Sequence, residues 1–375
     1  MRKVTVAAVQ MACSADREET LLKAEKLVRE AAAAGANVIL LQELFETPYF
    51  CQTHRFDRLY LCTAMEENPA VRRMRELARE LGVVLPVSFY EKAGSTAFNT
   101  AAMIDADGTI LGKYRKSHIP DGVPYAEKFY FTPGDTGFRV WPTRFGQMGV
   151  GICWDQWFPE AARCMALMGA ELLLYPTAIG SEPMLQVDSM PHWCRVMQGH
   201  AAANLVPVIA ANRVGTERQD ESELTFYGSS FITDETGEIL AQADRESEGF
   251  VTVQLDIALL GRGERDRIAV YAGKIRLIEV RIAGQETGIA AGNQHAQIEE
   301  KIPNAALFIF CGVERIQKVV IDHELVVVHA CTSQKRAGKA AAPFRNRGQS
   351  PARRSIRAVR SSEHPAARKS PGAFA

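Results

Sequence analysis

The chain has 375 residues, 47% of them hydrophobic, which is enough to bury a sizeable core. Residues 1–270 carry 27 Lys and Arg against 36 Asp and Glu, whereas residues 271–375 carry 17 against 8. An acidic body with no RNA-binding motif argues against a nucleic-acid partner. The chain shows no secretory leader and no apolar stretch of membrane-spanning length, so we expect a cytoplasmic protein with no membrane association.

The eight cysteines are scattered along the chain. None falls in a C-x-x-C pair, and no His and Cys spacing is typical of a zinc site. Scattered thiols stay free in a reducing compartment. We therefore predict no metal and no cofactor.

The first half of the chain predicts buried strands alternating with amphipathic helices. Short apolar runs predict strands at residues 4–9, 38–42 and 83–90. Asp16 and Asn68 predict the N-caps of two helices, which end at Gly35 and near Gly82. A turn at residues 105–108 predicts a hairpin of residues 99–105 and 109–114.

The second half continues the pattern as far as about Asp256. The predicted strands and helices there are strands 147–153, 172–175 and 206–211, helices 159–169 and 192–204, a hairpin of 231–233 with 239–241, and strand 250–255. Strands alternating with amphipathic helices indicate an α/β layered domain with helices outside the sheets. We expect this domain over residues 1–260.

The remaining residues have a different composition. Residues 261–334 form an extension of uncertain structure, in which residues 319–328 are compatible with one strand. Residues 335–375 are rich in Arg, Ala, Ser and Pro, with 11 Lys and Arg against a single acidic residue. This composition predicts a basic, disordered tail.

Three reactive side chains follow predicted strands. Glu43 follows strand 38–42, Lys116 follows the first hairpin, and Cys153 ends strand 147–153. Taken singly, each has an ordinary reading as a surface charge or a buried thiol. Together, a carboxylate, an ammonium and a thiol suffice for covalent attack on a carbon–nitrogen bond without a metal.

If these side chains converge, each has a chemical role. A nearby ammonium is expected to lower the thiol pKa of Cys153. Glu43 accepts the thiol proton, passes it to the leaving amine and then activates water. Lys116 and the N–H of Trp154, at the start of the following helix, stabilise the oxyanion.

The sequence around these residues resembles the nitrilase superfamily of carbon–nitrogen hydrolases. The matching segments are Leu41-Gln42-Glu43 with Tyr49-Phe50, Tyr114 to Pro120, and Gly151 to Asp155. The resemblance spans roughly the first 250 residues and implies a four-layer α-β-β-α sandwich, a Glu–Lys–Cys triad and a homo-oligomer built from dimers. It also implies a supporting role for Glu127, within Tyr125 to Gly134, beside the triad.

Further segments resemble the branch that hydrolyses the ureido group of N-carbamoylputrescine to putrescine, carbon dioxide and ammonia, on the agmatine route to polyamines. These segments are Trp154 to Arg163, Tyr175 to Pro183, His192 to His200 and Phe226 to Phe231. Such a small carbamoyl-amine substrate ends in an ammonium, which requires a carboxylate partner when buried. The predicted substrate-binding residues are Trp154, Tyr49, Tyr125, Glu182 and Asp188.

Several alternatives stay open. Asp188 also fits a plain helix-entry charge. An N-carbamoyl-β-alanine hydrolase would need a cation for the substrate carboxylate, and Arg195 and Arg213 are available. Other aliphatic amidases or nitrilases share the triad. Two non-enzymatic readings are an inactive oligomeric scaffold and a nucleobase platform formed by Trp154 and Trp157.

The C-terminal hundred residues depart from the superfamily, whose members end in a short segment containing Trp and Arg. No Trp follows Trp193 in this chain, and the sequence after residues 256–265 is unlike that segment. Our hypothesis is a shift of reading frame near residues 256–265. A genuine accessory tail that binds anionic partners is the competing interpretation.

Overall fold

The computed structural model describes residues 2–181, 187–257, 316–321 and 324–329. Two three-stranded sheets, β14-β1-β2 and β3-β4-β5, are joined by a parallel bridge between Val38 and Val84, and together they are called the first sheet here. Its strands are β1 (Lys3–Gln10), β2 (Val38–Leu40), β3 (Leu85–Ala93), β4 (Thr96–Ile104), β5 (Ile110–Arg115) and β14 (Gly249–Asp256). β14 lies at one edge of this sheet and pairs antiparallel with β1.

A second six-stranded sheet has the order β13-β12-β9-β8-β7-β6. Its strands are β6 (Val140–Thr143), β7 (Gly146–Val150), β8 (Leu172–Pro176), β9 (Val208–Ala211), β12 (Phe231–Thr233) and β13 (Ile239–Gln242). The central strands β7, β8 and β9 are parallel. β8 and β9 are buried along their whole length, as expected for parallel strands covered on both faces.

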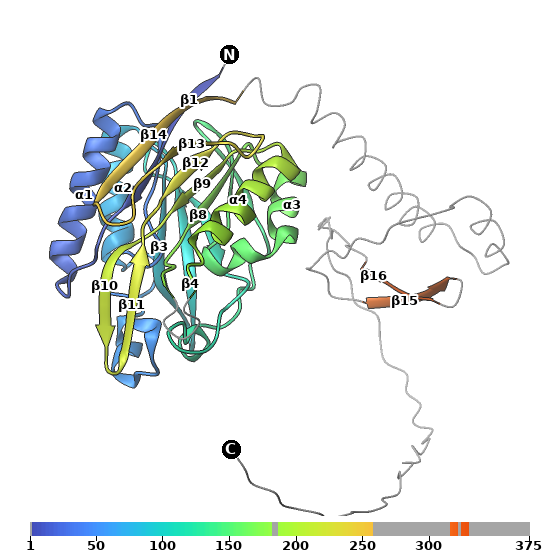
Figure 1. Cartoon of the computed structure of the whole chain (residues 1–375), viewed down its shortest axis with the longest axis horizontal. Helices are drawn as coiled ribbons and strands as arrows, with labels where there is room; N and C mark the ends of the chain where they lie inside the picture. The colour runs from blue at the N-terminus through green and yellow to red at the C-terminus, as the bar shows by residue number, and fades with distance from the viewer. Residues whose placement is uncertain (1, 182–186, 258–315, 322–323, 330–375) are drawn as a thin grey trace, which may run out of the picture. The chain divides into compact units, whose positions relative to one another are not determined.

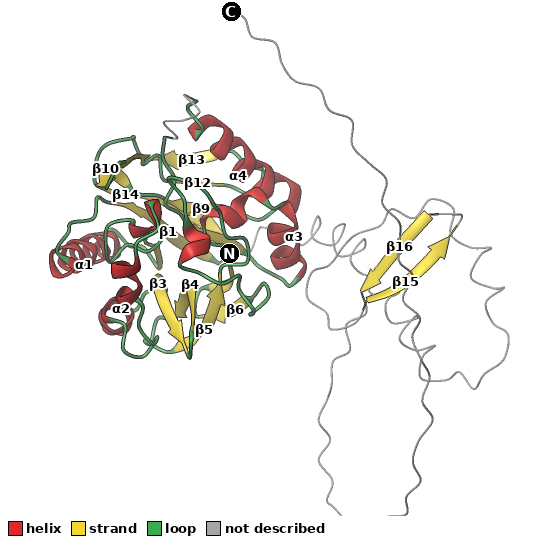
Figure 2. Cartoon of the chain, turned by 90° about the horizontal axis from the view of Figure 1, so that it is seen from below, coloured by secondary structure: helices red, strands yellow, loops and turns green. Residues whose placement is uncertain are grey.

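The two sheets lie face to face, with helices on their outer sides (Figures 1 and 2). Along β1 the side chains alternate: Val6 and Ala8 belong to the core between the sheets, whereas Ala7 and Val9 pack with the helices. The first sheet is covered by α1 (Arg17–Ala33) and α2 (Pro69–Leu81), and the second by α3 (Pro159–Leu167) and α4 (Met190–Asn204). The predicted α-β-β-α sandwich is confirmed.

The helix ends follow the predicted chemistry. The Asp16 side chain accepts from the N–H groups of Glu18 and Glu19, and that of Asn68 accepts from Val71. Gly82 ends α2 with φ +67°, a left-handed conformation that glycine adopts without strain.

Some elements differ from the predictions. A hairpin of β10 (Val214–Gln219) and β11 (Ser222–Tyr227) was not predicted. The predicted strand 319–328 is divided between two strands, β15 (Ile316–Ile321) and β16 (Glu324–His329), which pair antiparallel. The predicted extension and basic tail otherwise lie outside the described residues, so the domain boundaries stay a prediction.

Candidate active site

The three reactive side chains follow strands from both sheets. Glu43 follows β2, Lys116 follows β5 and Cys153 follows β7. Glu43 and Lys116 are fully buried, and Cys153 is 4% exposed. The N–H of Glu43 donates to the carbonyl of Thr177, just after β8, at 3.3 Å. This bond ties the two sheets together beside the reactive residues.

Lys116 lies between two buried carboxylates. Its Nζ donates to Glu43 Oε1 at 2.8 Å and to Glu127 Oε2 at 2.7 Å. The hydroxyl of Tyr49 donates to the other oxygen of Glu127 at 2.6 Å. The structure thus brings Glu127 to Glu43 and Lys116, in a cluster with one cation and two carboxylates.

This excess of negative charge shifts the pKa values in the cluster. Burial alone would lower the pKa of Lys116, but the carboxylates of Glu127 and Glu43 raise it well above its ordinary value. Burial raises the pKa of Glu127 to about 7; Lys116 acts against this rise and Glu43 adds to it. Lys116 is therefore a permanent cation, while Glu127 titrates near neutrality.

The Cys153 thiol shows a shift opposite to the one predicted. Burial raises its pKa well above the ordinary value, and Glu43 raises it further. Lys116 does lower it, but by less, so the predicted low thiol pKa is wrong. The resting thiol keeps its proton, with Sγ lying 3.8 Å from the carbonyl oxygen of Ala178. A base must remove this proton when the sulfur attacks.

Cys153 lies in a strained turn. Its φ is +42°, in the left-handed region that side chains other than glycine rarely adopt. The sequence placed Trp154 at the start of the following helix, but Trp154 lies in a short 3₁₀ turn, η4 (Cys153–Trp157), and α3 begins at Pro159, where the predicted helix 159–169 begins. The N–H of Trp154 therefore belongs to the first turn of η4.

Asp155 fixes this turn to β5, the strand that precedes Lys116. Its Oδ2 accepts from the N–H of Ile152 at 2.8 Å and from the hydroxyl of Tyr114 at 2.8 Å. Its Oδ1 lies 3.0 Å from the N–H and 2.7 Å from Nδ1 of His118. Sequence reasoning missed this role, although an acidic residue two positions after the cysteine was a visible signal.

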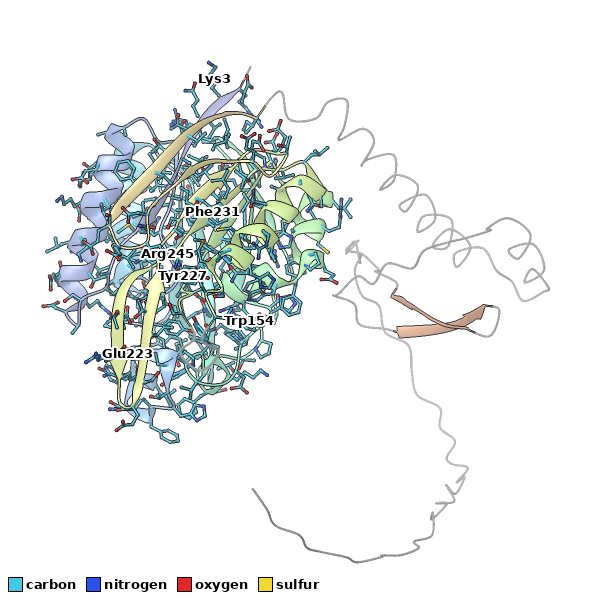
Figure 3. All side chains as sticks on the ribbon, in the orientation of Figure 1. Lys3, Trp154, Glu223, Tyr227, Phe231 and Arg245 are labelled. Carbon is cyan, nitrogen blue, oxygen red and sulfur yellow. The ribbon has the colours of Figure 1, made fainter. Side chains whose placement is uncertain are left out.

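The three aromatic residues predicted to bind substrate differ in exposure and in the residues that they contact. Tyr49 is 1% exposed and packs edge-on against Tyr125, with ring centroids 6.0 Å apart. The Tyr125 hydroxyl accepts from the N–H of Gly180 at 2.9 Å. Trp154, labelled in Figure 3, is partly exposed and forms a T-shaped pair with Trp157. Of these three, Tyr49 contacts the charged cluster directly, through Glu127.

Of the two acidic residues predicted to bind the substrate ammonium, Asp188 already has a partner and Glu182 is not described. Asp188 forms an exposed ion pair with Arg245 (labelled in Figure 3) at 2.7 Å, and accepts from the N–H of Met190 at 3.2 Å. This is the helix-entry role that the sequence left open. Glu182 lies outside the described residues.

The two arginines that could bind the carboxylate of an alternative substrate lie in different surroundings. Arg213 is fully buried and donates to the carbonyls of Glu43 and Leu44 and to the carboxylate of Glu217. Arg195 lies exposed on α4. Arg213 therefore supports the backbone at Glu43, and its donors are already engaged.

The described residues also show neither a metal site nor a membrane-spanning helix. No group of three or more His, Cys, Asp or Glu side chains there is arranged to hold a metal ion. No helix in the same ranges is long and apolar enough to cross a membrane.

Comparison with known proteins places these features in a family. The profile of the carbon-nitrogen hydrolases matches residues 5–265. An N-carbamoylputrescine amidase of Arabidopsis thaliana is 57% identical over 264 residues, which cover 69% of this chain and 88% of the relative. A citrullinase of Francisella tularensis is 52% identical over 261 residues, covering 69% and 91%.

The solved structures agree with the sequence relatives. A carbon-nitrogen hydrolase from Helicobacter pylori G27 superposes with a TM-score of 0.65 at 38% identity, over 69% of this chain and 91% of that one. The chain belongs to the carbon-nitrogen hydrolase family of the nitrilase superfamily, as its motifs predicted.

Proposed function

We propose that the protein hydrolyses the ureido group of N-carbamoylputrescine to putrescine, carbon dioxide and ammonia. The chemistry rests on one observation: the buried cluster of Glu43, Lys116 and Glu127, whose charges act on the Cys153 thiol. The substrate is supported by the likeness to the Arabidopsis thaliana enzyme. Putrescine is a diamine, so this reaction serves polyamine synthesis.

In the first half of the reaction Glu43 accepts the thiol proton as the sulfur attacks the carbamoyl carbon. Lys116 has three N–H bonds, and two of them go to carboxylates, which leaves the third for the developing oxyanion together with the N–H of Trp154. The carbon–nitrogen bond then breaks. The leaving nitrogen receives the proton from Glu43 and departs as ammonia, and the carbamoyl group stays on sulfur.

In the second half water replaces the leaving nitrogen. Glu43 accepts a proton from water as its oxygen attacks the carbamoyl carbon, and the carbon–sulfur bond breaks as the thiol regains a proton. The released carbamic acid decomposes to the amine and carbon dioxide. One water is consumed for each ureido group cleaved.

Citrulline is the second candidate because a citrullinase is among the relatives. Citrulline carries the same ureido group, and loss of its α-carboxylate gives N-carbamoylputrescine. A site for citrulline needs a cation for that carboxylate. Arg213, which was available from sequence, is occupied by Glu217 and by two backbone carbonyls. This occupancy favours the substrate without a carboxylate.

Ammonia release from N-carbamoylputrescine, citrulline and N-carbamoyl-β-alanine tests the proposal, with the wild type beside Cys153→Ala. We expect N-carbamoylputrescine to be preferred and its turnover to vanish in the variant. Preference for either carboxylate substrate would keep the thiol chemistry and overturn the substrate. Undiminished turnover by Cys153→Ala would overturn the mechanism.

We also propose a homo-oligomer built from dimers, which the family resemblance supports. If the sequence after residues 256–265 is non-native, the catalytic residues still assemble but contacts between subunits weaken. Size-exclusion chromatography of the full chain, beside a version with a family-like ending, tests this. An identical assembly state for both would contradict it.

A further inference from the structure

Asn99 is a hydrogen-bond partner of the Glu43 side chain. It is fully buried in β4, and its Nδ2 donates to Glu43 Oε1 at 2.7 Å. Lys116 Nζ donates to the same oxygen at 2.8 Å. The other oxygen, Oε2, is buried without a hydrogen-bond partner among the described residues. Both donors to the carboxylate therefore converge on one oxygen.

We propose that Asn99 is a positioning residue that fixes the Glu43 carboxylate so that Oε2 is the atom that accepts and returns protons. This inference rests on the proposed thiol mechanism. A carboxylate held by one flexible ammonium can turn and offer either oxygen, whereas a second donor on the same oxygen removes that freedom.

The unpaired oxygen supports this reading. A buried carboxylate oxygen without a partner costs free energy, and its neighbours usually rearrange to pair it. Here the two nearby donors, Asn99 and Lys116, share Oε1 instead. An acceptor left open in this way is what a proton-transferring atom requires.

Asn99 also fixes the other partner of the ion pair. Its backbone carbonyl accepts from the N–H of Lys116 at 2.8 Å, at the end of the pairing between β4 and β5. On its other side Asn99 pairs with Tyr90 of β3. A residue held between two strands therefore sets the backbone of the lysine and the side chain of the glutamate, which gives a precise site on rigid elements.

The test compares Asn99→Ala with Asn204→Ala, a matched control. Asn204, at the end of α4, is 4% exposed, donates once through Nδ2 (to the His200 carbonyl at 2.8 Å) and has an unpaired Oδ1, as Asn99 does. We expect Asn99→Ala to lower kcat by about 10- to 100-fold with KM changed less than about threefold. Asn204→Ala should change kcat less than about twofold.

The pH profile separates positioning from a structural role. Loss of the Asn99 donor should change the shape of the pH profile of kcat, whereas the loss of a merely structural hydrogen bond in Asn204→Ala should leave that shape unchanged. Asn99→Asp should be impaired more strongly at neutral pH, because it places a second acceptor against Glu43, and should recover part of the loss at lower pH. Equal stability loss in Asn99→Ala and Asn204→Ala, with kcat and the shape of its pH profile unchanged in both, would overturn the proposal.

A readout without substrate keeps this inference distinct from the proposed function. Iodoacetamide alkylation of Cys153, followed by peptide mass, needs the same proton transfer but no ureido group. We expect Asn99→Ala to slow this alkylation about 10-fold or more relative to Asn204→Ala. An unchanged rate would contradict the positioning role whichever ureido compound the wild type hydrolyses.

Discussion

Two buried clusters of ion pairs adjoin β5, and they differ in how their oxygens are paired. Glu91 accepts from Lys113 and from Arg115 Nη2 at 2.7 Å on Oε1, and from Arg115 Nε at 2.8 Å and Thr100 Oγ1 at 2.7 Å on Oε2. Two cations thus serve one carboxylate there. Both of its oxygens are occupied.

The cluster of Glu43, Lys116 and Glu127 reverses that ratio and leaves Glu43 Oε2 open. The pKa values of the carboxyl groups in the two clusters differ accordingly. Burial would raise the pKa of Glu91, but Arg115, Lys113 and Thr100 bring it below its ordinary value. The pKa of Glu127 instead rises to about 7. Burial with pairing marks a structural ion pair; surplus negative charge and an open oxygen mark a site for proton transfer.

The largest effect should follow from Lys116→Met. This change leaves Glu43 and Glu127 buried without their cation and removes a donor to the oxyanion. We expect kcat to fall by about 10³-fold or more, with a loss of about 3–5 kcal/mol in the free energy of unfolding. Steady-state kinetics and urea denaturation measure both.

Lys113→Met is the matched control, because Arg115 still pairs Glu91 after that change. It should leave kcat within about threefold of the wild type. Retention of more than about a tenth of the activity by Lys116→Met would remove the distinction between the two clusters.

A second effect concerns stability and pH. Glu127 has an ordinary pKa of 4.5 in the unfolded chain and about 7 when folded, so the folded state binds its proton more tightly. Its contribution to stability is therefore greatest below pH 4.5 and is lost as pH rises to about 7. The change is of order 3 kcal/mol, at about 1.4 kcal/mol for each unit of pKa difference.

Chemical denaturation of the wild type and Glu127→Gln between pH 4.5 and 8 isolates this contribution. As pH rises, the free energy of unfolding of the wild type should fall relative to that of Glu127→Gln. A difference independent of pH would show that Glu127 does not titrate in this range.

A smaller effect should follow from Tyr49→Phe. Tyr49 donates to Glu127, and its loss raises the pKa of that carboxyl above about 7. Activity should fall about 10-fold at pH 7, with the acid limb moved upward, because protonated Glu127 holds Lys116 less firmly. The pH profile of kcat/KM measures this. Tyr90→Phe, whose hydroxyl meets the Tyr130 carbonyl at 3.4 Å, is the control.

The smallest effect should follow from Asp188→Asn. Asp188 is paired with Arg245 at the entry of α4, so KM for N-carbamoylputrescine should change less than about twofold. A rise of KM of about 10-fold with kcat unchanged would instead support the predicted contact with the substrate ammonium.

Much of the fold and part of the site could be predicted from sequence. Apolar runs and caps such as Asp16 and Asn68 located most strands and helices, because these signals are local. Glu43, Lys116 and Cys153 were found because each follows such a run within a family motif. Glu127 came from the resemblance alone.

What sequence missed depends on contacts between distant segments. Asn99 and Glu43 are 56 positions apart, and Tyr114 and Asp155 are 41 apart, so no local pattern joins them. The direction of the thiol pKa was wrong because burial, which sequence does not measure, outweighs the nearby lysine. Arg213 was counted as available for a substrate because its backbone partners at Glu43 and Leu44 come from another strand end.

The most direct test of the two clusters compares Glu43→Gln with Glu91→Gln, each of which replaces a buried carboxylate by an amide of the same shape. With both proteins folded, as checked by circular dichroism, kcat for N-carbamoylputrescine is measured. We expect Glu43→Gln to lose about 10³-fold or more, because the neutral amide that replaces the carboxylate is not basic enough to take the thiol proton. Glu91→Gln should stay within about threefold of the wild type. Similar losses in both variants, or an active Glu43→Gln, would contradict the account.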